Sequence, residues 1–398
     1  MQYLVAQFRG RSKTSVLILI AVLACLAWPF FDEPLSKAQA DDALRIASIF
    51  PFSGPAAKAN ELSMLGVRWA VKEINRSGGI LGKRLELLEI DNASTPIGSK
   101  VAADKAVQGN VTAIIGPAWS SQALAVARVA QAHGIPMITN IATHPAVTRI
   151  GDYIFRVCYN DLLQGQVMAE FAHHELKARR VVILQDVTSD YSLGLASTFQ
   201  SFIEKGDAPD VVKLSYKARQ PDFADIVRQA REARPDIVFL PGHDESGAII
   251  AQAVNQGLKV AFLGGDGWDA QSFFQRGGHL LEKGYYTTHW DEAVQSRRSK
   301  EFYAKYKMRS PFLAPAALSY DAVYLLADAI GRAGSVKRDR IRNALLNTRD
   351  FEGVTGKLAF DAHGDPLKSV VIMKITNGRP SYYKRINSGQ SGRKAQSS

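Results

Sequence analysis

The sequence lacks the features of a disulfide scaffold, a cysteine-ligated zinc protein or a multi-pass membrane protein. Its 398 residues include only two cysteines, Cys25 and Cys158, which are too few for a disulfide framework or a zinc site. After residue 31 no run of 18 apolar residues occurs, so we expect no further membrane-spanning helix and a soluble mature chain. We interpret Cys158, alone once a leader carrying Cys25 is removed, as a buried structural residue.

Known catalytic motifs are missing as well. The segment 78–84 (GGILGKR) is similar to a phosphate-binding loop, but its glycine spacing is one residue short and it follows a helix. The run His173-His174-Glu175 lacks the second histidine of a zinc protease helix, and no Gly-x-Ser-x-Gly elbow occurs. We therefore expect no enzymatic activity, no cofactor and no metal site.

Charge of one sign is not concentrated anywhere. Lysine and arginine number 49 against 38 aspartate and glutamate, a net charge of +11, but the basic residues are scattered through the expected helices and loops. This distribution is typical of a basic soluble protein and not of a nucleic-acid-binding face. With 46% hydrophobic residues and this length, the chain can form two or three ordinary domains.

The N-terminus has the pattern of a secretory signal peptide. Basic residues at 9–13 precede an apolar stretch at 16–31, and a polar segment then ends in Ala38-Gln39-Ala40. The pattern predicts cleavage after residue 40 and a mature chain in the periplasm. Two alternatives stay open: an uncleaved anchor, for which Pro29 makes the apolar stretch marginal, and lipid modification at Cys25.

Short apolar runs alternate with helical periods through most of the chain, in two series of about 120 residues each. We expect Asn60 to cap the first helix and Gly78-Gly79 to end it. This alternation predicts an α/β fold with two doubly wound parallel-sheet lobes. The expected strands are 44–50, 85–91, 111–115, 136–139, 181–186, 211–216, 236–240 and 260–264, and the expected helices are 61–77, 97–108, 121–133, 193–205, 223–233 and 246–256.

The pattern is less regular after residue 290. Three more helices are expected, at 296–308, 315–333 and 339–347, followed by a hairpin at 368–385 that turns at Asn377-Gly378. The segment 386–398 has no periodicity and is predicted to be a flexible tail.

Three loops at expected strand ends are candidates for binding, because ligands of parallel sheets bind beyond the carboxyl ends of the strands. The loop 116–121 opens a helix at Ser120, where backbone N–H groups and the hydroxyl can receive an anion. Thr143 in the next loop could donate to the same anion, and Asp266, flanked by glycines, could meet a cation. The alternatives are a simple helix cap, an ordinary loop threonine and a solvated aspartate.

At these loops the chain resembles the periplasmic leucine/isoleucine/valine-binding proteins, the receptors of ABC importers with the type I periplasmic binding fold. The resemblance extends from about residue 43 to 385, and the order and spacing of its motifs are specific. It implies lobe I at 41–160 plus 291–350, lobe II at 161–290 plus 351–385, and a hinge of three crossovers. The motifs are Ser53-Gly54-Pro55, Ile74-Asn75-x-x-Gly78-Gly79-Ile80, Gly116-x-x-x-Ser120-Ser121, 134–139 (GIPMIT), and Phe351-x-Gly353-Val354-Thr355-Gly356 with Phe360-Asp361.

The resemblance also implies a binding site. The carboxylate site of the family falls on Ser120, Thr143 and the backbone at Ile141. The acid that binds the α-ammonium group falls on Asp266, and the tyrosine that assists it falls on Tyr191.

The chain departs from the family pattern beside this site. A family disulfide is replaced by Ser94 and Trp119, and the aromatic residue that commonly covers the ligand side chain becomes Ala59. His243 stands where a second cleft tyrosine is found. We include Trp119 and His243 among the ligand-binding candidates, and the side-chain preference of the family is not carried over.

The resemblance thus implies a monomeric periplasmic receptor that binds an amino acid, branched-chain or similar, and delivers it to the membrane permease of an ABC transporter. One alternative is a sensor for an amide, urea or an aromatic acid. Another is a secreted α/β hydrolase that uses Asp266, His243 and Asp244 as acid-base groups.

Overall fold

The computed structural model of the protein describes residues 43–205, 209–293 and 296–387. The chain divides into two units, Met1–Ala43 and Leu44–Ser398, and everything below concerns the second. The predicted signal peptide, with Cys25, lies outside the described residues, as does the predicted tail beyond residue 387. No helix in the described part of the chain is both long and apolar enough to cross a membrane.

The first sheet is fully parallel, with the order β2-β1-β3-β4-β5. Its central strands are almost entirely buried and mostly apolar, as expected where helices cover both faces of a sheet. The strands are β1 (Leu44–Phe50), β2 (Leu85–Asp91), β3 (Ala113–Ile115), β4 (Met137–Thr139) and β5 (Ile154–Arg156).

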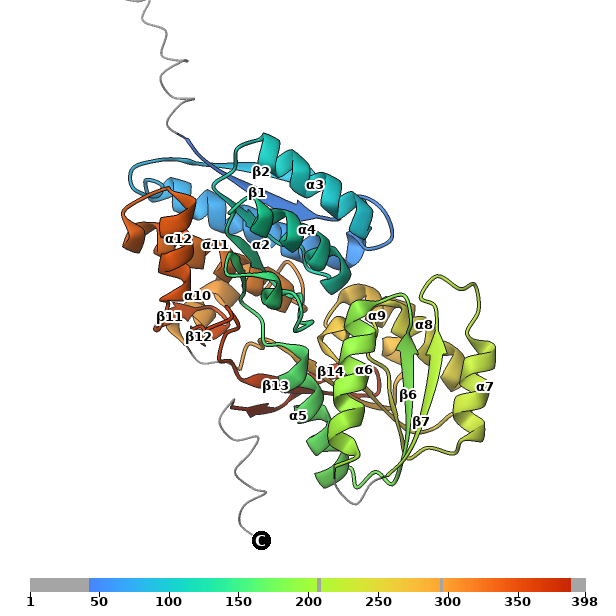
Figure 1. Ribbon diagram of the computed structural model, residues 1–398. Helices are drawn as coiled ribbons and strands as arrows, with labels where there is room; N and C mark the ends of the chain where they lie inside the picture. Colours follow the sequence, from blue (N-terminus) through green and yellow to red (C-terminus); the bar gives the residue numbers. More distant parts are fainter. Residues whose placement is uncertain (1–42, 206–208, 294–295, 388–398) are drawn as a thin grey trace, which may run out of the picture. The chain divides into compact units, whose positions relative to one another are not determined.

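Helices cover this sheet on two sides (Figure 1). On one face the core is formed with α2 (Ala57–Arg76), α11 (Ala314–Ala333) and α12 (Arg338–Leu346). On the other face it is formed with α3 (Pro96–Gln108) and α4 (Ser120–Ala132). Both α4 and the loop after β4 begin at the carboxyl edge of the sheet, which brings their residues together.

The second sheet has the order β14-β13-β10-β9-β8-β6-β7 and is parallel except at β13 and β14. Its strands are β6 (Arg180–Asp186), β7 (Asp210–Tyr216), β8 (Ile237–Phe239), β9 (Ala261–Gly264), β10 (Lys283–Thr288), β13 (Val370–Thr376) and β14 (Arg379–Ile386). One face packs against α5 (Asp161–His174) and α6 (Asp190–Ile203), which run side by side in Figure 1. The other face packs against α7 (Ala224–Glu232), α8 (Glu245–Asn255) and α9 (Gln271–Arg276).

Within the described residues the chain crosses between the two lobes three times, after β5, after β10 and before β13. Between the last two crossings lie α10 (Arg297–Tyr306), α11, α12 and the hairpin of β11 (Phe351–Gly353) with β12 (Gly356–Leu358). Phe351, Leu358 and Phe360 belong to the core of the first sheet. The lobe boundaries stay a proposal, but these contacts favour moving the last one from residue 350 to a point after Phe360.

The alternation predicted from the sequence is confirmed, and so are the ends of most elements to within a few residues. Gly78 and Gly79 end α2 as predicted, with φ angles of 97° and 80° and a bond from Gly79 N to Ile74 O. The hairpin turn at Asn377-Gly378 is also confirmed. The capping role of Asn60 is wrong, because α2 begins at Ala57 and the Asn60 amide instead donates to Ala56 O inside the helix.

Several elements were not predicted. The strands β5 and β10, the helices α5 and α9 and the hairpin of β11 and β12 are present in the structure. The three-residue strands are too short to show a period, whereas β10 (KGYYTT) is β-rich and could have been recognised from its tyrosine and threonine content.

Candidate functional site

Residues from the carboxyl ends of both sheets line a shared cavity of about 40 Å³. This is room for little more than water, so the lobes are closed on one another here. In the first lobe the lining residues come from α2, the start of α4 with the loop before it, the loop after β4 and the start of α11, and in the second lobe they come from α6 and the loops after β8 and β9. They are Ala59, Asn60, Ser63, Ala118, Trp119, Ser120, Ile141, Tyr191, His243, Asp266, Gly267, Asp269, Ala270 and Pro315.

The first lobe presents the N-terminus of α4 to the cavity. Trp119 occupies the N-cap position without a side-chain capping bond, and the first turn of the helix has no acidic residue. Ser120 Oγ accepts a hydrogen bond from His144 N at 3.2 Å, so its own proton remains available, and Ser121 Oγ accepts from Asp190 N at 3.2 Å. Neither serine caps the helix, and the end of α4 can receive an anion through its backbone N–H groups.

A buried ion pair fixes the conformation of the loop after β4. Arg156, fully buried on β5, lies 2.7 Å from Asp365 and donates to Ala142 O at 2.6 Å and to His144 O at 2.9 Å. These bonds determine the path of the loop that carries Ile141 and Thr143. Ile141 lines the cavity.

Thr143 is fully buried behind the cavity wall instead of lining it. Its hydroxyl lies against the buried Asp161 carboxyl, whose pKa this contact lowers in part. A role of Thr143 as a ligand donor stays a prediction.

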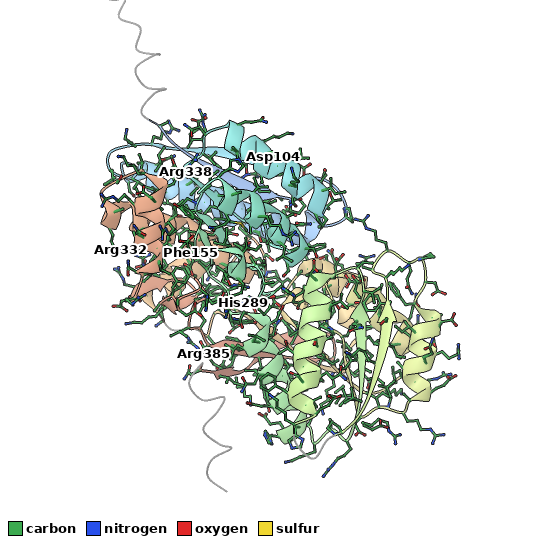
Figure 2. All side chains as sticks on the ribbon, in the orientation of Figure 1. Asp104, Phe155, His289, Arg332, Arg338 and Arg385 are labelled. Atoms are coloured by element: carbon green, nitrogen blue, oxygen red, sulfur yellow. The ribbon has the colours of Figure 1, made fainter. Side chains whose placement is uncertain are left out.

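The second lobe presents a buried carboxylate. Asp266 opens the 3₁₀ turn Asp266–Trp268 after β9 and is 6% exposed. Its oxygens accept hydrogen bonds from the Tyr191 hydroxyl and from Nε2 of His289, each at 3.0 Å, and its backbone N–H donates to Gln164 Oε1 at 3.1 Å. His289, which follows β10 and is labelled in Figure 2, is fully buried at this contact. The acid is therefore rigidly oriented toward the cavity.

The negative charge of Asp266 shifts the pKa values of neighbouring side chains. Burial, together with this charge, raises the pKa of Tyr191 well above its usual value and raises the pKa of the Asp161 carboxyl to about 8. Burial lowers the pKa of His289 although Asp266 opposes the effect, so the imidazole is a neutral donor. Asp266 thus has two hydrogen-bond donors but no cation beside it among the described residues.

Aromatic rings fill the space between the two lobes. The Trp119 indole stacks on the His243 imidazole, with ring centres 4.2 Å apart and planes 3° apart. His243 in turn stacks on Tyr191 at 4.9 Å and 16°. Trp119 and His243 are both only partly buried, and both line the cavity.

The structure brings together six of the seven predicted site residues, all but Thr143. The acid-base set of a hydrolase is not assembled, since Asp244 forms an ion pair with Arg276 at 2.7 Å instead of contacting His243. No group of three or more potential metal-ligating residues occurs in the described part of the chain.

Sequence reasoning missed other residues of the cavity and its supports. Asn60 and Ser63 lie on the buried face of α2, and no local pattern separates a cavity-lining position there from a core position. Asp269 belongs to the same glycine-flanked loop as Asp266 and could have been included. His289 follows an unpredicted strand, and only the fold places it at Asp266.

Known proteins with similar sequences and structures cover nearly the whole of this chain. The family described as periplasmic binding protein matches residues 43–380. The leucine-specific-binding protein of Salmonella typhimurium is 30% identical over 333 residues, 82% of this chain and 89% of that protein. The solved leucine binding protein LivK of Thermotoga maritima is 33% identical, with a TM-score of 0.83 over 87% of this chain and 99% of that one. LivJ of Streptococcus pneumoniae, solved with isoleucine, is 31% identical with a TM-score of 0.80 over the same shares.

Proposed function

Since the chain belongs to the periplasmic binding protein family, we propose that it captures an amino acid in the cavity between its two lobes. Proteins of this family are the non-enzymatic substrate-binding components of ABC transporters. The ligand would be released to the membrane permease of such a transporter.

One observation carries this proposal: the cavity has an anion site on one lobe and a buried carboxylate on the other. The N-terminus of α4 with Ser120 would bind the ligand carboxylate, and Asp266 with Tyr191 would bind the α-ammonium group. An α-amino acid is a small molecule that carries both an ammonium group and a carboxylate on one carbon atom. The names of the solved relatives, which include leucine binding and a complex with isoleucine, support the same ligand class.

The mechanism follows from the site being divided between two lobes. A ligand touches both Ser120 and Asp266 only when the lobes are closed, so its binding energy favours that form. The cavity of about 40 Å³ is far below the roughly 300 Å³ of a typical ligand pocket, and an amino acid must therefore move Trp119 or the lobes to enter. The bond from Asp190 N to Ser121 Oγ, which joins the lobes, would break and reform in each cycle.

The proposed place of action is the periplasm. Export would use the leader at 1–40, and the secreted chain should begin at Asp41. N-terminal sequencing of the protein recovered from the periplasm checks this, and a mature chain that begins at a lipid-modified Cys25 would contradict it.

A thermal-shift screen tests the proposed ligand class. The protein is heated with each common amino acid and, in parallel, with the corresponding deaminated acid. An amino acid at 100 times its Kd should stabilise the folded state by about 2.7 kcal/mol, which is a readily measured rise in Tm. Stabilisation by plain carboxylates alone, or by none of these compounds, would contradict the proposal.

A further inference from the structure

A second carboxylate lies on the wall of the same cavity. Asp269 follows Asp266 by one 3₁₀ turn, with its N–H donating to Asp266 O at 3.0 Å, and it is 8% exposed. One of its oxygens accepts from the Thr288 hydroxyl at 2.5 Å. No residue in the described ranges donates a hydrogen bond to the other oxygen.

Asp269 also has no cationic partner among the described residues. None of the ion pairs among the described residues includes Asp269, and His289, which is neutral, donates to Asp266 instead. Burial raises the pKa of Asp269 to about 7, and the oxygen that does not accept from Thr288 is free to accept a hydrogen bond from a group that enters the cavity.

The opposite wall is built from polar residues of α2. The Asn60 amide nitrogen donates one of its two protons to Ala56 O at 2.9 Å, and its carbonyl oxygen accepts from no residue in the described ranges. Ser63 Oγ accepts from Asn140 Nδ2 at 3.0 Å, so its own proton is available as a donor. Both residues are buried, at 2% and 1% exposure. Asn60 and Asp269 thus offer the cavity two acceptors, and a hydroxyl or amide on the ligand could also accept from Ser63.

We propose that the cavity selects amino acids whose side chain carries a hydrogen-bond donor, which Asp269 and Asn60 receive from opposite lobes. This inference rests on the proposed function and makes its ligand class narrower. An aliphatic side chain in the same place would give the Asn60 carbonyl oxygen and the second oxygen of Asp269 no donor, and sites built to hydrogen-bond a ligand group discriminate against analogues that lack it.

Calorimetry with pairs of isosteric amino acids tests the inference in the wild-type protein. Threonine and valine have nearly the same shape, as do asparagine and leucine, and only the first member of each pair carries a side-chain donor. The wild type should bind at least one donor member about tenfold tighter than its partner. Equal affinity within both pairs, or preference for valine and leucine, would overturn the inference without any variant.

Two variants test whether Asp269 causes the preference for side chains that carry a hydrogen-bond donor. Asp269→Leu, which is close in size, should reduce the ratio within the preferred pair to about threefold or less, and Thr288 keeps a contact with Trp290 O at 3.4 Å. Ser120→Ala is the matched control, since it should weaken both members equally and leave the ratio unchanged. If Ser120→Ala changes the affinity for neither amino acid of the pair, the proposed function is contradicted. If Ser120→Ala weakens the binding of both amino acids but the wild type prefers valine or leucine, only the inference about side-chain donors fails. Absence of binding by any amino acid would overturn both.

Discussion

Replacing Asp266 with asparagine separates ligand binding from stability. The carboxylate is 6% exposed and, among the described residues, accepts hydrogen bonds from Tyr191 and His289, both neutral. In the proposed function, the α-ammonium group of the ligand is the cation that completes this site. Removing one partner of a buried charge pair costs about 3 to 5 kcal/mol, so the Kd for an amino acid should rise by about 150- to 5,000-fold.

The fold should tolerate the same substitution. Asparagine has nearly the same shape, and its Oδ1 can still accept from the Tyr191 hydroxyl. Nδ1 of His289 has no hydrogen-bond partner among the described residues, so the ring can carry its proton there and accept from the new amide through Nε2. The substitution also removes a negative charge that repels the Asp161 carboxylate, and this repulsion is part of the reason that the pKa of Asp161 is raised to about 8. We therefore expect an unchanged or higher Tm.

The assay is a comparison of ligands. Wild type and Asp266→Asn are titrated calorimetrically with the best amino acid of the screen and with its deaminated acid, and both proteins are melted without ligand. Asp244→Asn serves as the control, because Asp244 lies outside the cavity in an ion pair with Arg276 and should leave both affinities unchanged. If Asp266→Asn weakens the amino acid no more than the deaminated acid, Asp266 does not bind the ammonium group and the reasoning is refuted.

Three further outcomes are expected. Ser120→Ala removes one hydrogen bond to the ligand carboxylate, of about 1.5 to 3 kcal/mol, and should raise the Kd of amino acid and deaminated acid alike by roughly ten- to a hundredfold; unchanged calorimetric titrations would contradict this. Asp365→Ala leaves the fully buried Arg156 without its ion-pair partner and should lower the free energy of unfolding, measured in urea, by about 3 to 5 kcal/mol. The control, Glu86→Gln, breaks the exposed pair Arg45–Glu86 and should lower it by less than about 1 kcal/mol. Equal losses in the two variants would refute the argument. Because the folded-state pKa of Asp161 is raised to about 8, the folded state binds more protons than the unfolded chain between about pH 4 and 8, so the free energy of unfolding falls as the pH rises through that range. Asp161→Asn should reduce the fall in the free energy of unfolding, measured in urea, between pH 6 and 8. An unchanged slope would show that another group is responsible.

Local patterns in the sequence determined most of the helices and strands, and they also pointed to two residues of the cavity. The strands β1 and β2 were predicted at their observed bounds, because short β-rich segments of mainly apolar residues that are followed by turn residues leave few other structures. Glycines with positive φ ended α2 for the same local reason. Ser120 and Asp266 were found because parallel strands always present their carboxyl-end loops on one edge of the sheet.

The sequence could not show which distant residues face these loops. The hydrogen bonds from His289 and Tyr191 to Asp266 join segments separated by 23 and 75 positions, and only the packing of α6 and β10 on one sheet brings them together.

Asn60 shows the same dependence within a single helix. Its sequence context suggested a helix cap, but the docking of α2 on the first sheet turns it toward the cavity instead. The burial of Asp269 and the stacking of Trp119 on His243 across the lobes were likewise decided by tertiary structure. Local periodicity specifies which face of an element is apolar, whereas the partners of its polar side chains depend on how separate elements pack, and that information is spread over the whole chain.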